Sequence, residues 1–136
     1  MRSIVLDNEA VQALTDARSP KHRAVVAHLA GVAARRRRGR VVEAVVPSAV
    51  RVEAGWDRTT PTAAAINRFP IRDHMLDSPS ANVAAHIQSA TSTGVADAHI
   101  GATVRSLSPA EVVVLTSDPA DVAAVCSPFA VTIVDV

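Results

Sequence analysis

Short apolar runs rich in valine and isoleucine alternate along the chain with longer segments of helical periodicity. The apolar runs predict strands at residues 3–7, 41–46, 70–73, 111–116 and 130–134. The segments between them predict helices from residue 9 and at residues 21–37, 48–58, 61–68, 80–91, 95–107 and 119–126. Gly39 is the expected stop of the second helix.

Strands that alternate with helices and are apolar throughout predict a parallel sheet covered by helices on both faces. The expected fold class is therefore a three-layer α/β/α domain that takes in all of residues 1–136. In such sheets, ligands bind at the carboxyl ends of the strands, near the point where the strand order reverses. That edge is the place to look for chemistry.

Composition excludes several classes of protein. Aromatic residues make up only 2% of the chain, which argues against modules that stack bases on aromatic side chains. Cys126 is the single cysteine, so a disulfide and a cysteine-rich metal site are excluded. The sequence has no secretory leader pattern and no long apolar stretch, and we expect a cytoplasmic protein.

Charge is distributed unevenly although the net charge is only +1. Residues 1–72 carry 13 basic and 6 acidic side chains, whereas residues 73–136 carry Arg105 against 7 acidic side chains. This asymmetry favours an anionic partner for one surface, unless the two halves interleave in the fold. A run of arginines could hold phosphates or could simply complement a helix terminus: Arg35, Arg36, Arg37, Arg38 and Arg40.

Four acidic residues occupy positions that suggest one shared site. Asp7 and Asp118 follow the first and fourth predicted strands, where each could also cap the next helix. Glu53 and Asp97 share helix faces with apolar residues, although each could reach solvent from the edge of its face. Carboxylates that converge on one pocket need a cation, and hard oxygen ligands suit Mg²⁺ or Mn²⁺. We therefore expect metal-assisted phosphodiester hydrolysis.

Four segments resemble the motifs of PIN-domain proteins, in the family's order and over almost the whole chain. They are Ile-Val-Leu-Asp-Asn at 4–8, Val-Val-Pro-Ser-Ala-Val-Arg-Val-Glu at 45–53, Ala-Asp-Ala-His-Ile-Gly-Ala-Thr at 96–103, and Val-Leu-Thr-Ser-Asp-Pro-Ala-Asp at 114–121. Within that family the chain looks most like a VapC-type toxin of a VapBC toxin–antitoxin pair.

The resemblance implies a five-stranded parallel sheet in the order 3-2-1-4-5. It assigns catalysis and metal binding to Asp7, Glu53, Asp97 and Asp118, with Asp121 as a further metal ligand and with Asn8 and Thr116 as supporting residues. It also implies a Mg²⁺-dependent endoribonuclease that acts on tRNA or rRNA, a cognate VapB-type antitoxin, and a homodimer.

One departure from the family pattern leaves an alternative open. Gly94 stands where many relatives carry an aspartate. The chain could therefore be a catalytically weakened PIN-like module that binds RNA or protein. The five histidines lack the spacing of zinc ligands and are expected at the surface or its boundary, while Trp56 and Cys126 are expected in the core or at a contact.

Overall fold

Five parallel strands make up the sheet of the computed structural model, which describes residues 1–136. They are β1 (Arg2–Leu6), β2 (Val42–Pro47), β3 (Ile71–His74), β4 (Glu111–Thr116) and β5 (Thr132–Asp135). Their order is β3-β2-β1-β4-β5, with Ile4 of β1 aligned with Ala44 of β2 and Val113 of β4. The strand order predicted from the sequence is therefore confirmed. The order reverses between β1 and β4, which are neighbours.

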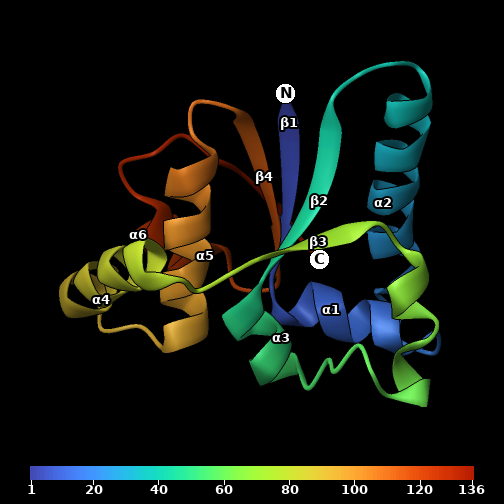
Figure 1. Ribbon diagram of the computed structural model, residues 1–136, viewed down its shortest axis with the longest axis horizontal. Coiled ribbons are helices and arrows are strands. Elements are labelled where there is room, and N and C mark those ends of the chain that lie inside the picture. The colour runs from blue at the N-terminus through green and yellow to red at the C-terminus, as the bar shows by residue number, and fades with distance from the viewer.

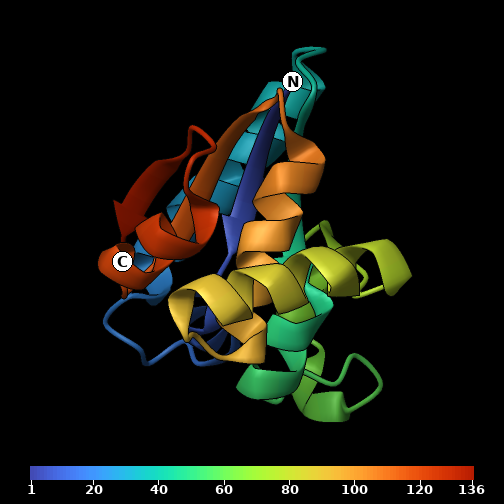
Figure 2. The ribbon, with the colours of Figure 1, turned by 90° about the vertical axis from the view of Figure 1, so that its left-hand side faces the viewer.

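Helices cover both faces of this sheet (Figures 1 and 2). The helices α1 (Asn8–Thr15) and α2 (His22–Arg37) pack on one face, and α5 (Val95–Leu107) and α6 (Pro119–Cys126) pack on the other. Helix α4 (Ser78–Thr91) packs outside α5, and the short α3 (Ser48–Ala54) follows β2 at the carboxyl end of the sheet. The predicted three-layer α/β/α fold is confirmed. None of these helices has the length and apolar character needed to cross a membrane.

The core explains why the central strands are apolar on both faces. Val5, Val45 and Val114 are inaccessible to solvent in the middle of the sheet. Helix α5 is buried along almost its whole length because the sheet, α4 and α6 surround it. At Gly101 a Cβ atom would collide with the carbonyl oxygen of Val125 in α6. The backbone of α6 therefore approaches α5 closely at Gly101.

Two predicted helices are shorter than the sequence suggested. Helix α3 ends at Ala54 and not at residue 58, because Gly55 adopts a left-handed conformation with φ of 69°. The predicted helix at 61–68 consists instead of two 3₁₀ turns, Pro61–Ala63 and Ile66–Arg68. Helices α5 and α6 and strand β4 have the predicted bounds, and α2 ends before Gly39, which has the expected positive φ of 76°.

Candidate acidic site

The two strand-end aspartates meet at the carboxyl edge of the sheet, where β1 and β4 lie side by side. Asp7 is buried and its carboxylate accepts two hydrogen bonds, from the Asn8 backbone N–H at 2.6 Å and from the Thr116 hydroxyl at 2.6 Å. The Thr116 hydroxyl in turn accepts from the Asp118 backbone N–H at 2.9 Å. Thr116 therefore ties the ends of the two strands together and fixes the orientation of the Asp7 carboxylate.

Asp97 brings the remaining acidic residues into the same cluster. It is half-buried in the first turn of α5, and its pKa is raised to about 6. Burial is the largest cause, followed by the negative charges of Asp7, Glu53, Asp121 and Asp118, in that order. The charges that raise the pKa of Asp97 all come from carboxylates. The other four acids named from the sequence therefore lie close enough to Asp97 to act on it.

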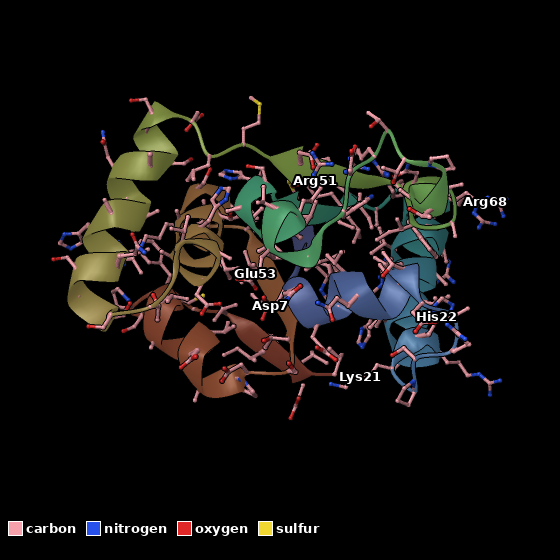
Figure 3. All side chains as sticks on the ribbon, turned by 90° about the horizontal axis from the view of Figure 1, so that it is seen from below. Asp7, Lys21, His22, Arg51, Glu53 and Arg68 are labelled. Carbon is pink, nitrogen blue, oxygen red and sulfur yellow. The ribbon has the colours of Figure 1, made fainter.

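Glu53 reaches this cluster from α3, but its environment differs from the one predicted. We expected Glu53 on a buried apolar face; the structure shows it exposed, with Val50 the single buried residue of α3. The helix is only seven residues long and its outer side faces solvent. Figure 3, which looks onto the carboxyl end of the sheet, shows Glu53 and Asp7 near each other, between α1, α3, α5 and α6.

Asp118 and Asp121 form a carboxyl pair at the exposed side of the cluster. Their side chains share a hydrogen bond, which raises the pKa of Asp121 together with the negative charge of Asp118. A hydrogen bond between two carboxyl groups requires a proton on one of them. The side chains of Asp118 and Asp121 therefore lie close together at this side of the cluster.

Three helices begin at the cluster and partly offset its charge. Asp7 is the N-cap of α1, Asp118 is the N-cap of α6, and Asp97 lies in the first turn of α5. Asp7 thus caps α1 through the Asn8 N–H and also belongs to the cluster, whereas the Asp118 side chain makes no capping hydrogen bond to α6. The amino terminus of a helix carries a partial positive charge, which favours carboxylates at these positions.

The donor set fits a hard divalent cation by its chemistry. It consists of carboxylate oxygens, it lies at the sheet edge where ligands bind, and its half-buried member lies near four further carboxylates. As the side chains stand, no group of three or more His, Cys, Asp or Glu residues is arranged to hold a metal ion. Binding would therefore require the exposed side chains of Glu53, Asp118 and Asp121 to turn inward.

A groove that the sequence did not reveal adjoins the acids. It has a volume of about 500 Å³ and lies between α3, the segment after β3, and the start of α5. Its lining combines Glu53 with apolar residues, among them Val52 (82% exposed) and Val95 (54% exposed). Arg51 also lines it, but its Nε lies 3.0 Å from Asp73, so Arg51 is paired away from Glu53. An extended ligand could contact both the acids and this apolar wall.

The arginine run lies at the opposite end of the sheet from the acids. Arg35 and Arg40 share a pocket with Arg2, which begins β1, whereas Asp7 follows the end of the same strand. A five-residue strand spans about 17 Å. Figure 1 shows the same separation, with the carboxyl end of α2 beside the N-terminus. On the face that carries the acids, the labelled basic residues Lys21, His22 and Arg68 lie to one side of Asp7 and Glu53 (Figure 3).

The other residues singled out in the sequence divide into correct and incorrect predictions. Trp56 is buried, and Cys126 is buried with its thiol pKa raised to about 11 by desolvation, as expected for core residues. His22, His28, His74 and His86 lie at the surface or its boundary, as predicted. For His99 the prediction is wrong, because this side chain is completely buried. The unbroken run of buried positions at 98–104 shows why: α5 has no solvent-facing side there.

The comparisons with known proteins bear on the fold alone. No protein-family model matches the sequence, and no curated protein matches it. Among solved structures, a chain in the structure of FitAB bound to an IR36 DNA fragment superimposes with a TM-score of 0.59. The alignment covers 96% of this chain and 94% of the other, at 20% sequence identity. The two chains share a fold.

Proposed function

We propose that the protein is a metal-dependent endoribonuclease of the PIN type, and the toxin of a VapBC-like toxin–antitoxin pair. The observation that carries the proposal is the cluster of five carboxylates at the switch point of the sheet, four of which act on Asp97. The fold shared with a chain of FitAB supports a toxin-type role. The four motifs of the sequence, in their order, favour the VapC type among toxins of this kind.

In this proposal Asp7, Glu53, Asp97, Asp118 and Asp121 hold Mg²⁺, with Mn²⁺ as a substitute. The bound ion supplies activation of water and stabilisation of the charge that develops on the phosphodiester. Thr116 and the Asn8 backbone N–H hold the Asp7 carboxylate in its orientation, since both donate hydrogen bonds to it. Asp97 loses its proton when a cation compensates the neighbouring charges.

The proposed substrate is cellular RNA, such as tRNA or rRNA, cut in the cytoplasm. Lys21 and Arg68 lie on the same side of the molecule as the acids but beyond α1, and Lys21 is paired with Glu9 at 3.1 Å, so these residues would meet phosphates away from the cut. The distant group of Arg35, Arg36, Arg37, Arg38 and Arg40 contacts the same RNA only if that RNA extends along the molecule. An RNA that contacts both sites has to span at least the roughly 17 Å of the strand between them.

Protein partners are also part of the proposal. The groove beside Glu53 has exposed apolar side chains that a monomer would leave in contact with water. An antitoxin segment seated in this groove would cover the apolar wall and reach the carboxylates with a basic side chain. The remaining apolar surface around Met75, which is 68% exposed, is available for a homodimer contact.

The decisive experiment measures cleavage of a total-RNA pool by the purified protein with Mg²⁺ and with EDTA. Wild type should cut only with Mg²⁺, and Asp97→Asn should lose at least a hundredfold in rate, because a ligand that also shapes the charge of the whole cluster is removed. Asp135→Asn is the matched control, since Asp135 lies at the same sheet edge but does not act on Asp97. Equal cleavage by wild type and Asp97→Asn would reject the proposal.

The second candidate function is a PIN-like module that binds RNA or protein without cutting. Gly94 favours this function, because it supplies no carboxylate at a position where many PIN-domain proteins carry an aspartate. Calorimetric titration with Mn²⁺ separates the two functions. Micromolar binding that disappears in Asp97→Asn supports the enzyme, whereas RNA binding without metal binding supports the module.

A further inference from the structure

Helix α3 begins without a capping side chain. Its N-cap residue is Pro47, which has no side-chain acceptor, so the first amide groups of the helix need partners from elsewhere. The Ala49 N–H donates to Nδ1 of His99 in α5, at 3.3 Å. The Ser48 hydroxyl accepts a hydrogen bond from the Leu76 N–H, at 3.1 Å, and so ties the start of α3 to the segment after β3. The side chain of His99, from the neighbouring helix α5, therefore accepts the hydrogen bond that an N-cap side chain would normally accept.

The hydrogen bonds of His99 fix its tautomer. A backbone N–H can only donate, so Nδ1 of His99 is unprotonated and the proton of the neutral ring is on Nε2. That Nε2 lies 3.3 Å from Nδ1 of His74 at the end of β3. Burial, and after it the nearby charge of His74, lowers the pKa of His99 to about 4.

The position of His99 connects two members of the acidic cluster. Asp97 lies two residues before His99 in α5, and Glu53 lies four residues after Ala49, one turn further along the same side of α3. Helix α3 has one fully buried side chain, so apolar packing alone holds it weakly. The Ala49–His99 hydrogen bond is the one hydrogen bond that joins α3 to α5, alongside the packing of the two helices.

We propose that His99 is a positioning residue of the acidic site, which caps α3 through Ala49 and so holds Glu53 at its working distance from Asp97. This inference rests on the proposed nuclease function for its catalytic consequence. His99 itself touches neither metal nor substrate. His74 and Thr103 support it: the Thr103 hydroxyl donates to the His99 carbonyl at 2.7 Å and lies 3.2 Å from His74 Nδ1.

Three substitutions separate capping from packing. In His99→Asn the amide oxygen stands where Nδ1 stood and can still accept from Ala49. In His99→Gln the polar group moves out towards the position of Nε2, so the link to His74 is kept and the cap is lost. His99→Leu fills the space without either polar group. His86→Asn, at an exposed histidine of α4, is the control.

Mg²⁺ affinity, measured by calorimetry with the metal alone, is the first readout. His99→Asn should stay within about threefold of wild type, while His99→Gln and His99→Leu should each lose about tenfold or more, the usual cost of removing a group that orients metal ligands. In RNA cleavage the same two variants should lose kcat with little change in KM, because substrate contacts are untouched. If His99→Leu bound Mg²⁺ more tightly than His99→Asn, the proposal would be overturned, because filling the space, and not accepting from the Ala49 N–H, would then be what the site needs from residue 99.

Amide hydrogen exchange in metal-free protein keeps this test separate from the proposed function. The Ala49 amide should exchange slowly in wild type and His99→Asn and faster in His99→Gln. If wild type neither binds Mg²⁺ nor cuts RNA, the nuclease proposal fails, and the Ala49 exchange rates still decide whether His99 holds α3. Equal exchange at Ala49 in wild type, His99→Asn and His99→Gln would refute the capping role, and this comparison does not require His99→Leu to fold.

Discussion

Replacing Asp97 by asparagine should stabilise the metal-free protein while it removes the metal-dependent gain in stability. The folded-state pKa of Asp97 is about 6, against 3.8 for the free side chain. A difference of this size corresponds to about 3 kcal/mol at most, since each pKa unit is worth about 1.4 kcal/mol. Solvent screening of a half-buried carboxylate reduces the expected gain for Asp97→Asn to about 1 kcal/mol at pH 8.

The sign of the pH dependence follows from the raised pKa. Between pH 4 and pH 6 the folded protein keeps a proton on Asp97 that the unfolded chain has lost. This contribution to stability is complete below about pH 4 and is lost as the pH rises through about 6. The difference between wild type and Asp97→Asn should therefore be near zero at pH 4 and largest at pH 8.

Urea unfolding followed by the fluorescence of Trp56, the single and buried tryptophan, provides the assay. In EDTA at pH 8 the midpoint for Asp97→Asn should exceed that of wild type. With Mg²⁺ at a hundred times its dissociation constant, wild type should gain about 2.7 kcal/mol and overtake the variant. Asp135→Asn controls for loss of one negative charge. A variant that is less stable than wild type in EDTA at pH 8 would refute the electrostatic reasoning.

Three further substitutions test the geometry around the cluster. Thr116→Val should lower the free energy of unfolding in urea by about 1 to 3 kcal/mol, because the Asp118 N–H loses its acceptor and Asp7 loses a donor. Thr116→Ser keeps the hydroxyl and should retain most of the wild-type stability. Gly101→Ala should lower the free energy of unfolding by about 1 to 3 kcal/mol, since the added methyl collides with Val125; an unchanged midpoint would contradict this packing. In Gly94→Asp the added side chain enters open space at the N-cap of α5. It should tighten Mg²⁺ binding in calorimetry and change the metal-free stability little. Weaker Mg²⁺ binding would show that the added carboxylate only increases repulsion.

The order of elements and the edge that carries the acids follow from the sequence alone. The predicted bounds of β4, α5 and α6 agree with the structure because capping residues, prolines and apolar runs are local signals. Asp7 and Asp118 were identified by their place after apolar strands, and parallel strands bring such residues to one edge. The chemistry of the five acids as metal ligands remains a prediction, since their roles are untested.

Tertiary structure alone decided how each side chain in the site is surrounded. Glu53 is exposed because Gly55 ends α3 early and nothing packs on the outer side of so short a helix. His99 is buried because the sheet, α3, α4 and α6 together leave that part of α5 no face to solvent. Periodicity reports which side of a helix is apolar, whereas burial depends on how many neighbours pack against it. Those neighbours come from distant parts of the chain, and their positions are set by the assembled fold.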